Sequence, residues 1–251
     1  MKYGAQSRGR LDRVPEDQQL IFDNVDLHEA DYSGRKVVHF VATASRFDRC
    51  RFERMVADHV SFGAGMGPSL YRECTFDGSW LRIDVVGRAR FERCSFANVR
   101  LSDLRCHAAE FVGCTFSGRI ERGFFNGTVP PDQQRGLGRI RNEIRENDFS
   151  CMDLLDVSFR TGVDLRQQRL PEGPELLYIE HAASAIESAW KEVSGWQAVE
   201  RKEGMAILGA LRLDLEGGQD QLLMRCDELG SKSTDVGEAV LGLLQRFARR
   251  G

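Results

Sequence analysis

The residues of this sequence that could most readily form disulfides or bind a metal are its seven cysteines. Four of them occupy the same position in a repeated sequence motif, three residues after an aromatic residue: Cys50, Cys74, Cys94 and Cys114. No two cysteines have the C-x-x-C spacing that is typical of zinc sites, and the N-terminus lacks the apolar run of a secretion signal. Disulfides are rare in proteins of reducing compartments. Because a free cysteine packs as a small hydrophobic residue, we predict that these four fill small inward-facing positions.

Two histidines have a spacing that could contribute to a metal site. His39 and His59 are 20 residues apart, which is the length of the repeat described below, and Asp58 lies beside the second. We therefore expect the two imidazoles to point outward on adjacent turns of the chain. A zinc site needs further ligands, but the equivalent later position is Ile83. The sequence thus favours surface histidines and predicts no metal.

The glycine-rich segment Gly63-Ala-Gly-Met-Gly67 resembles a phosphate-binding loop. Such loops need a strand before them and a helix after them, and here the same repeat flanks both sides. We therefore interpret residues Gly63–Pro68 as an insertion loop. No G-x-S-x-G nucleophile motif is present either. The sequence predicts no catalytic residue, no cofactor and no enzymatic activity.

Arginines in a short basic segment are the remaining candidates for binding. Apolar residues recur there at helical spacing, at Leu137, Ile140 and Ile144, which predicts an amphipathic helix inserted within about residues 120–148. Its arginines could grip a phosphate or a partner's carboxylates, although intervening glutamates favour a solvated face. Together with the loop they form the predicted partner-binding set: Met66, Arg135, Arg139, Arg141 and Arg145.

The elements that position these residues follow from a repeat. The six-residue motif that contains each of the four cysteines occurs four times, at Phe47–Phe52, Tyr71–Phe76, Phe91–Phe96 and Phe111–Phe116. Bulky apolar residues fall at every fifth position. A step of five fits neither a helix nor a simple strand, but it fits a chain that turns a corner after each short segment. Repeat periods of this kind are typical of solenoids.

This pattern, from about residue 20 to residue 170, resembles the pentapeptide-repeat family. The resemblance implies a right-handed quadrilateral β-helix of about six coils. It also implies an alternative function, because some members bind type II DNA topoisomerases such as gyrase as DNA mimics and protect them from quinolones. Those members are acidic rods that dimerise through their C-terminal ends, whereas this chain has a longer helical tail.

Outward charges test the register of the coils. The step from Phe47 to Tyr71 is 24 residues, and excising four residues of the Gly63–Pro68 loop restores a step of 20. Two outward columns then read His28, Asp48, Arg72, Glu92 and Glu29, Arg49, Glu73, Arg93. After the first turn, opposite signs alternate down both columns, as expected when adjacent strands pair.

Composition divides the chain into three parts: an arm at residues 1–19, the coil at residues 20–170 and an α-helical domain at residues 171–251. Residues 1–170 carry 26 Lys and Arg against 24 Asp and Glu, and residues 171–251 carry 9 against 14, so the net charges are +2 and −5. Neither value suggests nucleic-acid binding. No apolar run is long enough for a membrane helix, and we expect a cytoplasmic protein.

Four helices are predicted in the last part, each marked by an apolar stripe. The first covers about residues 176–193. The second follows the capping-box sequence Ser194-Gly-Trp-Gln197 and runs towards Leu215. The third and fourth cover about residues 222–229 and 236–247. Their apolar faces pack on one another or on the last coil. The functional hypothesis from shape is a non-catalytic protein-interaction module, with the loop, the insertion and the tail as contact sites. A topoisomerase-binding DNA mimic is the alternative, and a homodimer is compatible with either.

Overall fold

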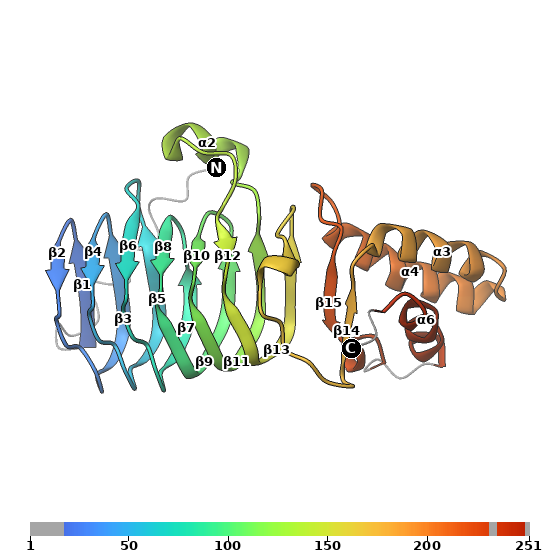
Figure 1. Ribbon diagram of the computed structural model, residues 1–251, viewed down its shortest axis with the longest axis horizontal. Coiled ribbons are helices and arrows are strands. Elements are labelled where there is room, and N and C mark those ends of the chain that lie inside the picture. Colours follow the sequence, from blue (N-terminus) through green and yellow to red (C-terminus); the bar gives the residue numbers. More distant parts are fainter. Residues whose placement is uncertain (1–17, 231–234, 249–251) are drawn as a thin grey trace.

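The computed structural model describes residues 18–230 and 235–248, so the predicted arm lies almost entirely outside the described residues. Strands stack side by side along most of the molecule, and helices gather at one end (Figure 1). The first sheet contains, in spatial order, β1 (Gln19–Asp23), β3 (Lys36–Thr43), β5 (Val56–Ala64), β7 (Trp80–Val85), β9 (Ser95–Cys106), β11 (Thr115–Asn126) and β13 (Asp148–Arg160). The second contains β2 (Asp26–His28), β4 (Arg46–Asp48), β6 (Ser69–Arg72), β8 (Ala89–Glu92), β10 (Glu110–Val112) and β12 (Ile144–Arg145).

The chain alternates between these two sheets and pairs every strand in parallel with its neighbours. A chain that returns to the same sheet one strand further along on each circuit is a solenoid. The prediction of a mainly β solenoid with a helical part is confirmed.

Corners of the solenoid explain the period of five. Residues with left-handed backbone recur at that interval, with φ between 47° and 72°, at Asn24, Glu29, Gly34, Ala44, Arg49 and Arg54. Non-glycine residues rarely adopt this conformation, so each corner needs support. The next coil supplies it: the Asn24 amide donates to the Thr43 carbonyl and the Glu29 amide to the Asp48 carbonyl, both at 2.9 Å.

The interior consists of ladders of identical side chains. Phe96 stacks between Phe76 at 4.8 Å and Phe116 at 4.9 Å, with ring planes within 4° of parallel. The four cysteines of the repeat are buried and free, as predicted. The Cys94 thiol donates to the carbonyl of Tyr71 at 3.4 Å, one coil back, and burial raises its pKa. Close-packed ladders of this kind leave little room for changes in side-chain volume.

The predicted charge columns exist. Strand pairing aligns His28 with Asp48, Asp48 with Arg72 and Arg72 with Glu92. Ion pairs join His28 to Asp48 at 2.9 Å and Arg72 to Glu92 at 3.3 Å. In the neighbouring column Arg93 pairs with Glu73 at 2.8 Å. Phe47 also aligns with Tyr71, which confirms that four extra residues are extruded between these coils.

The predicted inserted helix is wrong in its extent. Residues Ile120–Asn126 continue β11, the helix α2 spans only Pro131–Leu137, and Ile144 belongs to β12. Gly138 ends α2 in a left-handed conformation with φ 65°. The apolar spacing that predicted a longer helix arises from a short helix, a turn and a strand in succession.

The C-terminal part contains a hairpin that the sequence did not predict. An antiparallel pair, β14 (Leu176–Ile179) and β15 (Leu222–Arg225), replaces the starts of the first and third predicted helices. The helices are α3 (Ala182–Ser194), α4 (Ala198–Asp214), α5 (Cys226–Gly230) and α6 (Asp235–Gln245). The predicted capping box is absent, since Ser194 donates to the Trp190 carbonyl and α4 begins without a side-chain cap.

The hairpin closes the C-terminal end of the solenoid. Leu223 of β15 joins the solenoid core, while its neighbours Leu222 and Met224 face the core of the helices. Two buried glutamines before β15, Gln219 and Gln221, bond the backbone of the last coil. The tail therefore packs on the coil as well as on itself. No helix of the described residues is long and apolar enough to cross a bilayer.

Candidate partner-binding corner

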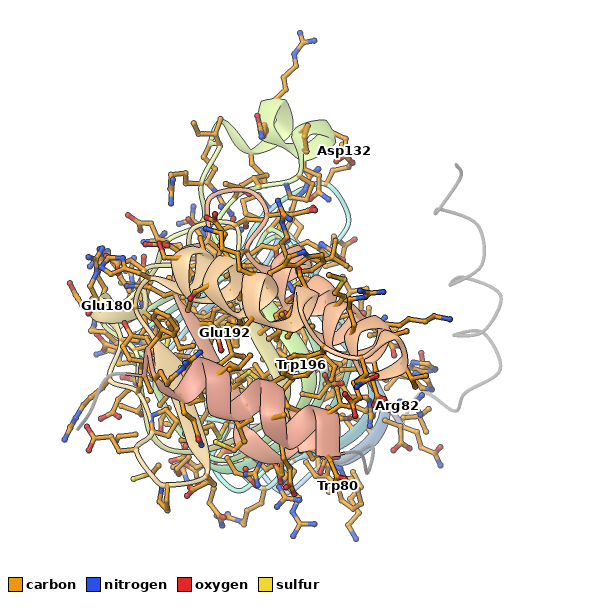
Figure 2. All side chains as sticks on the ribbon, turned by 90° about the vertical axis from the view of Figure 1, so that its right-hand side faces the viewer. Trp80, Arg82, Asp132, Glu180, Glu192 and Trp196 are labelled. Atoms are coloured by element: carbon orange, nitrogen blue, oxygen red, sulfur yellow. The ribbon has the colours of Figure 1, made fainter. Side chains whose placement is uncertain are left out.

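Two insertions project from the same edge of the solenoid. The Gly63–Pro68 loop begins within the last two residues of β5 and leads to β6, and α2 rises above the strands between β11 and β12 (Figure 1). In the view along the solenoid, Asp132 of α2 marks the upper side of the molecule (Figure 2). Sequence separation hides this proximity, because the two segments belong to different coils.

Arg88 joins the two insertions. Its Nη1 donates to the carbonyl oxygen of Met66, and a Cβ built on Gly136 of α2 would lie 3.5 Å from the same nitrogen. We call the Gly63–Pro68 loop, Arg88 and α2 together the insertion corner. One guanidinium thus lies between a loop and a helix that the sequence alone could not bring together.

Glycines fix the base of the loop. A Cβ at Gly87, whose φ is +60°, would lie 2.0 Å from the carbonyl oxygen of Gly63. The amide of Arg88 donates to that same oxygen at 3.0 Å. Because only glycine permits so close an approach, the loop leaves the solenoid at a defined place and direction.

The insertion corner exposes large side chains. Met66 is 79% exposed at the tip of the loop, and Ile140, which follows α2, is 65% exposed. Arg135 of α2 is exposed and has no carboxylate within 4 Å among residues 18–230 and 235–248. The structure therefore places two of the predicted partner-binding residues, Met66 and Arg135, at the surface of one corner. Sequence reasoning had assigned Ile140 to the apolar stripe of a helix and so missed its exposure.

Arg139 and Arg141 serve the fold itself. Arg139 donates to the carbonyl of Ala108 at 2.8 Å and contacts the side chain of Asn142, and its burial lowers its pKa. Arg141 donates to the carbonyl of Gly162 at 2.7 Å. Both guanidiniums thus fasten the segment after α2 to neighbouring coils. Their geometry leaves less freedom for a partner than the sequence suggested.

A buried carboxylate completes this anchorage. Glu110 is only 7% exposed and accepts from Arg90 at 3.0 Å and from the amide of Glu143 at 3.1 Å, with Arg139 at 3.3 Å. A buried charge is tolerated when it is paired and hydrogen-bonded in this way. Arg90 also contacts Glu143 at 2.7 Å, so one network ties β8, β10 and β12 together.

The fifth predicted residue, Arg145, lies in β12 and is half-buried. It pairs with Glu146 at 2.8 Å and approaches Glu143 at 4.0 Å. Its charge is thus compensated by the two residues that flank its own strand. The structure does not bring Arg145 together with Met66 and Arg135 at the insertion corner.

The histidine pair differs from its prediction. The two residues are neighbours on adjacent coils, as predicted, but His39 is only 7% exposed and so is not a surface histidine. It aligns with Gln19 on one side and with His59 on the other, and the two imidazoles stack at 5.1 Å. His59 bonds Asp84 at 2.9 Å. Across the described part of the chain, no three His, Cys, Asp or Glu side chains cluster in a way that could hold a metal ion.

Comparisons with known proteins add a distant likeness in fold. No family model matches the chain, and no curated protein matches it. Among solved structures, it is similar to trypsin-treated QnrB1, described as a plasmid-mediated fluoroquinolone resistance protein. The sequences are 14% identical, the match covers 57% of this chain and 84% of that one, and the TM-score is 0.24. A likeness at this level carries no functional argument, and the strand pairing alone establishes the solenoid.

Proposed function

We propose that this protein is a non-catalytic protein-interaction module built on a pentapeptide-repeat scaffold. The family proposal rests on the left-handed corners at five-residue intervals and on the stacked aromatic and cysteine ladders. A solenoid of this kind is a stiff body that presents extended faces. Its role is then to hold a contact surface in a fixed orientation.

The observation that supports the contact surface is the convergence of two insertions at one corner. Arg88 donates to the loop and lies beside Gly136 of α2, and Gly63 and Gly87 fix the exit of the loop. Yet Met66 at the tip stays almost fully exposed. Methionine and arginine are both enriched in protein interfaces, and a methionine adapts its shape to a partner. We assign partner binding to Met66 and Arg135, with Ile140 beside them.

The charge pattern favours a protein partner other than one that normally binds DNA. A DNA mimic needs carboxylates that are free to imitate phosphates. In the two outward columns Glu73 and Glu92 are already paired with arginines of adjacent coils, and Asp48 contacts the imidazole of His28. A type II topoisomerase therefore remains the second candidate partner, without a specific observation in its favour.

Affinity purification of the tagged full chain from its native host tests the proposal. Wild type is compared with Met66→Asp/Arg135→Glu. The matched control is Val199→Asp/Arg201→Glu on α4, where both side chains are exposed and the change in charge is the same. Truncation of the tail is unsuitable because β15 contributes Leu223 to the solenoid core.

Proteins lost only with the corner variant are then purified, and their affinity is measured by calorimetry. We expect the corner variant to weaken binding by at least about tenfold, which corresponds to ~1.4 kcal/mol, and the control to bind like wild type. Equal recovery and equal affinity for the two variants would show that the insertion corner is not the contact surface.

A further inference from the structure

A second exposed surface lies on the first sheet, away from the insertion corner. In β7 the side chains alternate, so that Leu81 and Ile83 are buried while Trp80 and Arg82 face solvent. Trp80 is 58% exposed. Strand pairing places Val56 of β5 on one side of it and Arg100 of β9 on the other. We call Val56, Trp80, Arg82 and Arg100 the Trp80 surface.

The cations of the Trp80 surface form no close ion pair within the described residues, although, after the hydrogen bond from Arg122, the charge of Arg82 also helps to lower the pKa of Asp103 of β9. Neither Arg82 nor Arg100 has a carboxylate within 4 Å among residues 18–230 and 235–248. Their neighbours on the same sheet are paired: Arg119 contacts Asp153 at 2.8 Å, and Arg122 contacts Asp103 at 3.1 Å.

Two other carboxylates on neighbouring strands of this sheet, Asp84 and Asp58, form no ion pair with Arg82 or Arg100 either. Asp84, further along β7, is engaged by His59 at 2.9 Å. Asp58 of β5 is exposed and forms no ion pair with either arginine. Two guanidiniums without a close carboxylate partner thus lie beside an exposed indole, Arg100 on the next strand and Arg82 two residues along β7.

We propose that the Trp80 surface binds an acidic segment of a partner protein. Neighbouring strands are about 4.8 Å apart, and alternate residues of one strand are about 6.6 Å apart. Arg100 and Arg82 therefore flank the indole within reach of carboxylates on one extended segment. Guanidinium groups bind carboxylates through paired hydrogen bonds. Tryptophan and arginine are the residues that most often dominate the affinity of protein interfaces.

Charge and shape distinguish this partner from nucleic acid. Single-stranded nucleic acid is bound by a basic groove with several aromatic residues on which successive bases stack. The Trp80 surface has one aromatic residue on an open sheet, and the whole chain carries a net charge of −3. A second copy of this chain is the other acidic source, because residues 171–251 carry a net charge of −5.

The Trp80 surface is physically separate from the insertion corner. In the view along the solenoid, Trp80 lies at the lower side of the molecule and Asp132 of α2 at the upper side (Figure 2). Variants of one surface therefore leave the other intact. The two proposals can fail independently.

Fluorescence of Trp80 reports binding when Trp190 and Trp196 are replaced by phenylalanine. The full-length protein is titrated with dodecaglutamate at low salt, and Arg82→Ala/Arg100→Ala is compared with the matched control Arg201→Ala/Arg212→Ala, two exposed arginines of α4 that have no ion pair within the described residues. We expect saturable binding that the first pair of substitutions weakens at least tenfold and the control pair leaves within twofold. Trp80→Ala, measured by calorimetry, should weaken binding as well. Met66→Asp/Arg135→Glu should not.

Four results would each overturn the proposal. Dodecaglutamate does not bind wild type, or it binds the arginine variant as well as wild type. Twelve-residue oligothymidylate binds more tightly than dodecaglutamate, which would assign the surface to nucleic acid. The protein self-associates in sedimentation through Arg82 and Arg100, which would assign the surface to a second copy.

Discussion

Replacement of Gln219 by alanine should destabilise the closed end of the solenoid. Its Oε1 accepts from the amides of Gly162 at 3.1 Å and Val163 at 2.9 Å. Its Nε2 donates to the carbonyls of Val163 at 3.1 Å and Gln221 at 2.8 Å. The residue is only 3% exposed. One side chain thus satisfies backbone groups that would otherwise be left at the edge of the last coil.

The size of the effect follows from these four bonds. Gln219→Ala leaves two buried N–H donors without an acceptor, and each such group costs about 1–3 kcal/mol. Water that enters the vacated space offsets part of this cost. We expect the free energy of unfolding to fall by about 2–4 kcal/mol. Gln219→Glu at a pH where the carboxyl is protonated keeps an acceptor oxygen and offers one O–H donor in place of two N–H donors, so its loss should be intermediate.

Urea unfolding followed by circular dichroism and by tryptophan fluorescence measures the loss. Gln197→Ala is the matched control, because Gln197 is exposed and its side chain does not cap α4. A loss for Gln219→Ala below about 1 kcal/mol, indistinguishable from the control, would refute the inference that this glutamine closes the solenoid.

Four further outcomes are expected. Phe96→Ala should lower the free energy of unfolding by about 3–5 kcal/mol in urea, because its ring stacks on both sides; a cost near that of an exposed site would contradict the ladder. Cys94→Ala should fold and Cys94→Arg should not, since the latter buries an unpaired charge, and native Cys94 should react slowly with thiol reagents; fast labelling without denaturant would be inconsistent with its burial. A hydrogen bond from Arg90 lowers the pKa of Glu92, so the stabilising contribution of the Glu92 carboxylate is present above the ordinary glutamate pKa and is lost as the pH falls through the pKa of the folded protein. Glu92→Gln should therefore lose less stability than wild type between neutral pH and pH ~3. An equal loss in the two proteins would exclude this contribution. The protein should neither inhibit gyrase supercoiling nor relieve its poisoning by quinolones, and inhibition that weakens steeply with salt would instead support the DNA-mimic alternative.

The repetitive part of the fold was predictable because every inward position is specified many times. Phe76, Phe96 and Phe116 each predict the same ladder, and the alternating charges at Arg72 and Glu92 predict the same register. Agreement among independent positions made the four-residue extrusion near Met66 visible in the sequence. The five-residue period and the pairing of charges across strands therefore predict the solenoid and its register from the sequence.

The rest depends on contacts between segments that are distant in sequence. Residues 222–225 have the apolar composition of a helix stripe, yet they form β15 because β14 offers an antiparallel edge and Leu223 fills the end of the solenoid. The role of Arg88 likewise requires the loop and α2 to be adjacent in space. Arg139 looked like a binding residue because its acceptor, the Ala108 carbonyl, belongs to another coil.

Closure by the glutamines also limits how this chain can assemble. An uncapped last coil would offer free amides and carbonyls, on which another molecule could continue the stack. Here Gln219 and Gln221 occupy those groups and Leu223 fills the apolar end. A second molecule therefore cannot stack coaxially on this end, because its backbone hydrogen-bonding groups are already bonded and its apolar surface is already covered. A homodimer of this chain therefore cannot form by direct stacking of its last coil on the last coil of a second copy.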